Sequence, residues 1–110
     1  MSQFRRIGLM GRVGNPEVLE TLVHLRELLR ARGREVVVER EVAEQLGSLP
    51  EEVLPREEIG RHTELVIVVG GDGSLLGAAR ALAAQSAPVL GVNRGRLGFL
   101  TDISPQQLEA

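Results

Sequence analysis

The apolar residues of this 110-residue chain change their spacing along the sequence, and each spacing predicts a different element. A short apolar run at residues 7–10 ends among glycines, which is typical of a strand that leads into a loop. Leucine and valine then recur at intervals of three and four residues, which predicts an amphipathic helix from Pro16 to Arg32. Asn15 is placed to cap the start of this helix, and Gly33 is placed to follow its end.

Shorter apolar runs predict the strands of a sheet. The β-branched run 35–39 follows the first helix directly, so we expect a strand–helix–strand unit with a parallel crossover. The run 65–69 is apolar throughout and ends at two glycines, which is typical of a central strand buried on both faces. A leucine- and alanine-rich helix is expected at residues 74–84, and another strand at residues 89–92. The pattern predicts an α/β fold with an open parallel sheet and flanking helices.

The segment from residue 40 to residue 63 lacks a clear period. Prolines and glycines interrupt it, so we expect a surface connection with one short helix near residues 42–46. Its acidic pairs, Glu51-Glu52 and Glu57-Glu58, are interpreted as solvated charges rather than catalytic carboxylates, because nothing nearby in the sequence would bury them.

The composition excludes several chemistries. All 13 cationic residues are arginine, so a phosphate loop ending in Gly-Lys-Ser/Thr and a lysine Schiff base are both impossible. The chain has no cysteine, which excludes disulfides, thiolate nucleophiles and zinc ribbons. His24 and His62 are too far apart for a His-x-x-x-His zinc motif, and we expect His24 to lie on the solvated face of its helix.

Charge and hydropathy also limit the partners. The formal net charge is −2, the arginines are scattered among glutamates, and only 2% of the residues are aromatic, which argues against a nucleic-acid surface. No apolar run approaches the roughly 18 residues of a membrane span. We therefore expect a soluble, cytoplasmic protein without a nucleic-acid or membrane partner.

A glycine-rich turn, Gly70-Gly71-Asp72-Gly73, follows the predicted central strand. Ligands of open α/β sheets bind at this end of a strand, and three glycines allow positive φ angles and a close approach of the backbone to phosphate. Asp72 needs a separate explanation in such an anion-friendly turn. It could accept a proton or a hydrogen bond from a substrate hydroxyl, coordinate Mg²⁺ on nucleotide phosphates, or simply cap the helix or close an Asx-turn.

Two longer strings carry a family resemblance. Residues 67–80 read Ile-Val-Val-Gly-Gly-Asp-Gly-Ser-Leu-Leu-Gly-Ala-Ala-Arg, and residues 91–102 read Gly-Val-Asn-Arg-Gly-Arg-Leu-Gly-Phe-Leu-Thr-Asp. Together they closely resemble the NAD kinases, which phosphorylate the adenosine ribose 2′-hydroxyl of NAD to make NADP. The resemblance extends from Ile7 to Asp102.

The resemblance implies that residues 1–110 form the Rossmann-like N-terminal α/β nucleotide-binding domain of such a kinase, with ATP as the phosphate donor and a divalent metal, Mg²⁺, as cofactor. It also implies a homo-oligomer at full length. By the same resemblance, Asp72 is the catalytic proton acceptor. The implied NAD contacts are Asp72, Gly73 and Phe99, and the implied contacts to the ATP phosphates are Gly70, Gly71, Gly73 and Ser74.

Some alternatives remain open. The 6-phosphofructokinases and the diacylglycerol and sphingosine kinases also carry Gly-Gly-Asp-Gly, although the string after residue 91 is similar to the NAD kinases instead. The family's second signature, an Asn-Glu or Asn-Asp pair in a β-rich C-terminal domain, is not in this sequence, and Ser104-Pro105 predicts a helix that the chain does not complete. We therefore expect the chain alone to be inactive or weakly active, with a non-catalytic nucleotide-binding or regulatory module as the alternative.

The first glycine cluster is a weaker signal. Gly8, Gly11 and Gly14 recur at every third residue, which is not the Gly-x-Gly-x-x-Gly spacing of a dinucleotide-binding turn. We interpret Gly11 and Gly14 as turn residues and Arg12 as a weak candidate for a phosphate contact. Residues alone do not choose between ATP and polyphosphate as the donor.

Overall fold

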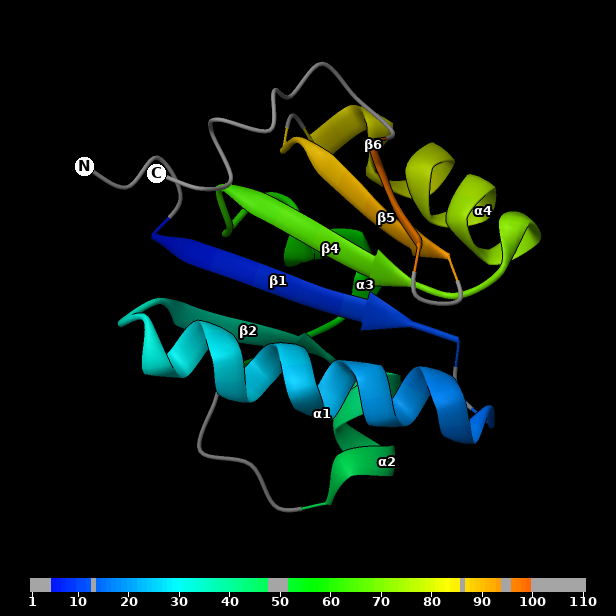
Figure 1. Ribbon diagram of the computed structural model, residues 1–110. Coiled ribbons are helices and arrows are strands. Elements are labelled where there is room, and N and C mark those ends of the chain that lie inside the picture. Colours follow the sequence, from blue (N-terminus) through cyan, green and yellow to red (C-terminus); the bar gives the residue numbers. More distant parts are fainter. Residues whose placement is uncertain (1–4, 13, 48–51, 86, 94–95, 100–110) are drawn as a thin grey trace.

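The strands predicted from apolar runs form one mixed sheet in the computed structural model, which describes residues 5–12, 14–47, 52–85, 87–93 and 96–99 (Figure 1). The elements in chain order are β1 (Arg6–Gly11), α1 (Pro16–Ala31), β2 (Glu35–Glu39), α2 (Arg40–Leu46), β3 (Glu52–Leu54), α3 (Arg56–Ile59), β4 (Leu65–Val69), α4 (Asp72–Leu82), the 3₁₀ turn η1 (Ala83–Gln85), β5 (Val89–Asn93) and β6 (Arg96–Phe99). The spatial order of the strands is β3-β2-β1-β4-β5-β6. The first five of these pair in parallel, and β6 runs antiparallel to β5. The predicted Rossmann-like α/β fold is confirmed.

Helix α1 begins and ends where its capping residues predict. The Asn15 side-chain oxygen accepts hydrogen bonds from the N–H groups of Glu17 (2.9 Å) and Val18 (3.3 Å), and Pro16 takes the first helical position. Gly33 has a φ of +77°, the left-handed conformation that glycine adopts without a steric cost. His24 is exposed on this helix, as expected from its position off the apolar stripe.

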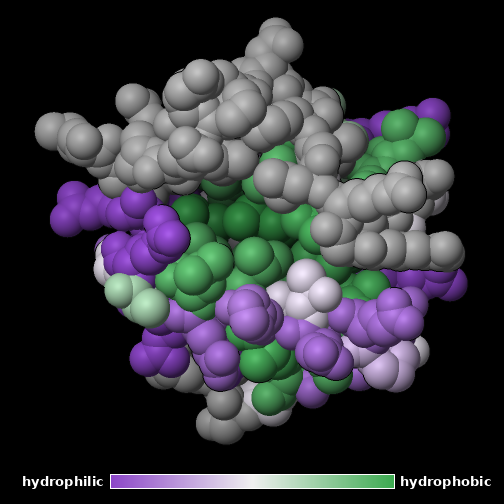
Figure 2. Space-filling view, viewed as in Figure 1, coloured by the Kyte–Doolittle hydropathy of each residue, from purple (hydrophilic) through white to green (hydrophobic). Residues whose placement is uncertain are grey.

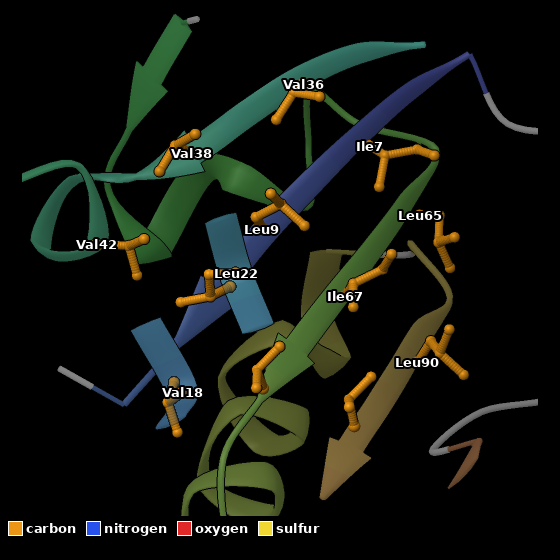
Figure 3. Close-up of a cluster of buried hydrophobic side chains, with 12 residues drawn as sticks. Ile7, Leu9, Val18, Leu22, Val36, Val38, Val42, Leu65, Ile67 and Leu90 are labelled. Carbon is orange, nitrogen blue, oxygen red and sulfur yellow. The ribbon is translucent and has the colours of Figure 1, made fainter. Parts of the chain in front are cut away.

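Two apolar layers hold helices against opposite faces of the sheet. On one face, α1 and α2 pack over β1, β2, β4 and β5, and Figure 3 shows Val18, Leu22 and Val42 lying over the strand residues. On the other face, α3 and α4 contribute Ile59, Leu75, Ala78 and Leu82. Every residue of β4 is buried, which confirms the prediction of a central strand. In the space-filling view, hydrophobic residues gather over the sheet, with hydrophilic residues below them over α1 (Figure 2).

Three short elements differ from the prediction. The expected surface connection contains α2, as predicted, but also β3 and α3, which extend the sheet and cover its far face. The segment after β5 forms β6, which was not expected. Residues 104–105, where a helix start was predicted, lie outside the described residues.

The described helices include none that is both long enough and apolar enough to cross a membrane. Among the acidic pairs predicted to be solvated, Glu52, Glu57 and Glu58 are exposed, and residue 51 lies outside the described part.

Candidate functional site

The candidate site lies at the carboxyl ends of β1 and β4, which are neighbours at the centre of the sheet (Figure 1). The chain leaves β1 toward α1 on one face and leaves β4 toward α4 on the other. Ligands of open α/β sheets bind in the crevice that forms where connections diverge in this way. The N–H of Arg12 donates to the carbonyl of Val69 (3.2 Å), so the loop after β1 is tied to the end of β4.

Helix α4 begins earlier than the sequence predicted. Its first residue is Asp72 rather than Ser74, and Gly71 is the N-cap, with φ −91° and ψ −179°. Asp72, Gly73 and Ser74 therefore form the first helical turn, whose N–H groups have no partner within the helix. Gly71 has no side chain with which to cap them. The result is a helix N-terminus that receives no cap from its own N-cap residue and points at the crevice, which suits an anion.

The glycines of this turn matter because they lack a side chain, and not because they adopt unusual backbone angles. Among the described glycines, the positive φ angles belong to Gly14, Gly33 and Gly47, so the Gly70–Gly73 turn does not use the positive φ that its glycines allow. A Cβ added at Gly70 would lie 2.9 Å from Ser74 Cβ, so the close approach of β4 to α4 requires glycine there. A Cβ added at Gly71 or Gly73 would meet nothing within 4 Å. These two positions leave the approach to the helix start open.

Gly11 and Gly14 also differ from each other. Gly14 has a φ of +88°, which confirms it as a turn residue. Gly11 is instead the last residue of β1, where an added Cβ would lie 2.8 Å from Leu22 Cδ1 and 3.1 Å from the Val69 carbonyl oxygen. Glycine at this position allows the end of β1 to pack under α1.

Two predicted site residues have side chains outside the described part of the structure, namely Asp72 and Phe99. Their main chains are described. Asp72 follows the carboxyl end of β4, whereas Phe99 pairs with Leu90 near the amino end of β5. The structure therefore brings Gly70, Gly71, Asp72, Gly73 and Ser74 together but does not bring the main chain of Phe99 to them.

Arg12 borders cavities on both faces of the sheet edge. A cleft of about 450 Å³ on the α1 side lies between Arg12, the start of α1 and the Gly70-Gly71 turn. A second cavity of about 370 Å³ lies on the α4 side and is bordered by Arg12, Arg56, Gly73 and Ser74. Within the described residues the Arg12 guanidinium makes no hydrogen bond or ion pair. Its position strengthens the weak prediction that Arg12 contacts phosphate.

Glu39 is a buried carboxylate that the sequence analysis missed. It ends β2, is only 2% exposed, and its Oε2 lies 3.0 Å from Arg56 Nε. Burial raises the pKa of Glu39 above its ordinary value, although the neighbouring Arg56 opposes part of that rise. An acid at the end of the second strand binds the ribose in many dinucleotide-binding sheets. Here the Glu39 carboxylate pairs with Arg56 instead. An acid at the end of an apolar run is the sequence signal that could have drawn attention to Glu39, but in this chain it marks a buried ion pair and not a ribose contact.

No group of three or more histidine, cysteine, aspartate or glutamate side chains is placed to hold a metal ion within the described ranges.

Comparisons with known proteins agree with this fold. A family model described as the ATP-NAD kinase N-terminal domain matches residues 7–110. The protein named NAD kinase in Hahella chejuensis is 55% identical over 109 residues, and the one in Pseudomonas fluorescens is 53% identical over 109 residues. Each alignment covers 99% of this chain and 37% of the relative, so the chain spans just over a third of the length of these curated relatives.

A solved structure supports the fold independently. The crystal structure of yeast NADH kinase complexed with NADH superposes with a TM-score of 0.69 and covers 96% of this chain and 34% of that one. The sequence identity is 23%, so this likeness concerns the fold alone.

Proposed function

This chain belongs to the ATP-NAD kinase family, and on that premise we propose that it forms the N-terminal α/β part of an enzyme that transfers phosphate from ATP to the adenosine ribose 2′-hydroxyl of NAD, giving NADP. The observation that carries the proposal is the uncapped start of α4 at Asp72, placed at the crevice between β1 and β4. The match of residues 7–110 to the family and the relatives named NAD kinase support the same activity.

The backbone of the Gly70–Ser74 segment binds the donor phosphates in this proposal. The N–H groups of the first turn of α4 donate to phosphate oxygens, and the positive end of the helix dipole adds a favourable charge. Gly71 and Gly73 let the phosphates approach, because no side chain occupies the space beside them. Since the chain has no lysine, the remaining positive charge comes from arginine.

Asp72 acts on the acceptor. Its carboxylate orients the ribose 2′-hydroxyl and takes its proton as the hydroxyl oxygen forms a bond to the γ-phosphorus and the bond from that phosphorus to ADP breaks. Gly73 and Phe99 are the further NAD contacts in this proposal, with Phe99 contacting a part of the dinucleotide away from the start of α4, because its main chain pairs with Leu90. A helix start directly after β4 explains how one short segment can serve both donor and acceptor, because Asp72 and the phosphate-binding N–H groups belong to the same turn.

We also propose Mg²⁺ as the accompanying metal, since it neutralises charge on the phosphates of a bound nucleotide. Within the described residues there is no cluster of three potential metal-ligating side chains. Few protein ligands are needed for this metal, which commonly keeps water and substrate phosphates in its coordination sphere.

The test of Asp72 is the Asp72→Asn variant of the full-length protein. NADP formation from ATP and NAD should fall by about 10²–10⁴-fold in kcat, because the variant retains the shape of the side chain but loses the proton acceptor. Calorimetry should show NAD affinity close to that of the wild type. Glu57→Gln is the matched control, because it also replaces a carboxylate by an amide, at an exposed position on α3. This variant should retain full activity. Wild-type turnover by Asp72→Asn would refute the role of Asp72.

A second experiment separates catalysis from binding by this chain. The 110-residue chain is titrated with ATP and with NAD by calorimetry, beside an assay for NADP. We expect binding of ATP without NADP formation, since the relatives are nearly three times as long as the matched segment. NADP formation by the chain alone would contradict the expectation that the site needs further residues. Homo-oligomer formation and a cytoplasmic location stay predictions.

A further inference from the structure

The cavity on the α4 face of the sheet edge has features that the glycine-rich turn does not explain. It has a volume of about 370 Å³, within the usual range of small-molecule pockets. One wall comes from the end of β1 and the segment after it, another from α3, and a third from α4. The lining residues are Gly11, Arg12, Glu41, Arg56, Val68, Gly73, Ser74 and Gly77.

Arg56 is held at this cavity by a buried partner. Its Nε donates to Glu39 Oε2 over 3.0 Å, and Glu39 is 2% exposed, so this side of the guanidinium is fixed. The Arg56 side chain is 42% exposed, and its Nη groups make no hydrogen bond within the described residues. A guanidinium has donors on both edges, and here one edge is fixed while the Nη donors remain available.

The other walls favour an anion as well. Arg12 approaches from the end of β1, and the first turn of α4 contributes Gly73 and Ser74. Gly77 lies one helical turn later, and an added Cβ at Gly73 or at Gly77 would meet nothing within 4 Å. The lining holds two guanidiniums and one carboxylate, Glu41, and the buried Glu39 offsets the charge of Arg56, so the cavity offers guanidinium donors without a net positive charge.

We propose that this cavity binds the polyphosphate chain of the phosphate donor, with Arg12 and Arg56 contacting its terminal phosphates from different walls and Glu39 acting as the positioning residue of Arg56. This inference rests on the proposed kinase function. The donor fits the cavity better than the pyrophosphate of the dinucleotide does, because a triphosphate carries more negative charge and the cavity reaches the same helical turn that binds the transferred phosphate.

The first test uses inorganic tripolyphosphate as the probe and the chain itself as the protein. Calorimetric titration should show binding by the wild type and a loss of affinity of about tenfold or more in Arg12→Gln, since a charge-assisted hydrogen bond is removed. Arg61→Gln is the matched control, because Arg61 is exposed and precedes β4 at the opposite edge of the sheet. Equal affinity in Arg12→Gln and the wild type would overturn the role of Arg12.

Arg56 requires a variant that still folds, because removing it alone leaves the Glu39 charge buried without its partner. The double variant Arg56→Gln with Glu39→Gln removes both charges and should bind tripolyphosphate about tenfold more weakly. The single variant Glu39→Gln keeps the Arg56 charge but weakens the contact that holds the guanidinium in place. Its loss of tripolyphosphate affinity should therefore be smaller than that of the double variant. Unchanged affinity in a folded double variant, shown by cooperative thermal unfolding, would overturn the role of Arg56.

Steady-state kinetics of the full-length protein separate this inference from the proposed function. Arg12→Gln and Glu39→Gln should each raise KM for ATP and leave KM for NAD unchanged. A rise in KM for NAD alone would assign the cavity to the dinucleotide and overturn the donor assignment. If the wild type forms no NADP, the proposed function fails, whereas the tripolyphosphate titrations still decide whether the two arginines form an anion site.

Discussion

Strand β1 has an arginine at its start and another just beyond its end, and the two side chains have opposite surroundings. Arg6 donates to Glu35 (2.9 Å), to Glu52 (2.8 Å) and to the carbonyl oxygen of His62 (2.7 Å). The Arg12 guanidinium, at the other end, makes no hydrogen bond or ion pair within the described residues. The same residue type therefore links neighbouring strands at the amino edge of the sheet and is left available at the carboxyl edge.

The two edges differ in the same way beyond these arginines. At the amino edge, the Glu64 carboxylate accepts hydrogen bonds from the N–H groups of Arg5 and Arg6, so backbone donors find partners within the chain. At the carboxyl edge, the N-cap of α4 is Gly71, which has no side chain to cap the first N–H groups of the helix. The comparison teaches that one end of this sheet satisfies its polar groups internally, whereas the other leaves donors and open space for a ligand.

The largest effect is expected within the glycine-rich turn, where neighbouring glycines should respond in opposite ways. Gly70→Ser should lower the free energy of unfolding by about 1–3 kcal/mol, because its Cβ would lie 2.9 Å from Ser74 Cβ. Gly71→Ser should leave stability unchanged or raise it, since the position is open and a serine can cap α4. Urea denaturation measures both. Equal losses of unfolding free energy in the two variants would contradict the interpretation that glycine at position 71 keeps space open for a ligand.

A smaller effect should separate the two arginines. Arg6→Gln should lower the free energy of unfolding by about 1 kcal/mol, because its ion pairs are partly exposed and worth little individually. Arg12→Gln should leave it unchanged within error while weakening polyphosphate binding. Thermal unfolding and calorimetry on the same pair of variants provide the measurements. If Arg12→Gln is less stable than Arg6→Gln, the proposed difference between the two edges of the sheet is wrong.

The subtlest prediction concerns pH, because Glu64 and Glu39 have opposite pKa shifts. Hydrogen bonds from the N–H groups of Arg5 and Arg6 lower the pKa of Glu64 below its ordinary value of 4.5, so its stabilisation is present above that pH and is lost as pH falls. Burial raises the pKa of Glu39, so its stabilising influence is present below pH 4.5 and is lost as pH rises through the shifted pKa.

Comparing each glutamine variant with the wild type from about pH 3 to about pH 7 tests these signs. Stability relative to Glu64→Gln should move in favour of the wild type as pH rises. Stability relative to Glu39→Gln should move in favour of the variant over the same range. Denaturation curves at several pH values measure both differences, and parallel trends for the two variants would refute the opposite pKa shifts.

Long periodic segments of this fold were predictable from the sequence. Helix α1 has a cap at each end and an apolar stripe, and β4 is an uninterrupted apolar run, so local signals and tertiary packing agree. Strand β3 was not predictable, because its three residues have no period and depend on pairing with β2. Helix α3 is equally short, and Ile59 is fully buried only because distant elements surround it.

The candidate site was predictable in place but not in detail. A glycine-rich turn after a buried strand predicted the position of the helix start, and the resemblance identified the family. The start of α4 at Asp72 and the reasons for glycine at positions 70 and 71 depend on distances across the turn. The pairing of Glu39 with Arg56 joins two segments that the sequence keeps apart, so no local pattern could indicate it.

The central position of β4 also bears on how the site forms. The register pairs Ile7 with Val36 of β2 and with Leu65 of β4, and the second partner is twice as far along the chain as the first. Closing the longer segment costs about 0.6 kcal/mol more in loop entropy. Because neither β1 nor β4 alone contains both sides of the crevice, ligand affinity can appear only once the chain has been synthesised and folded past α4. A nucleotide bound at this crevice would in turn stabilise the pairing of the two halves of the sheet.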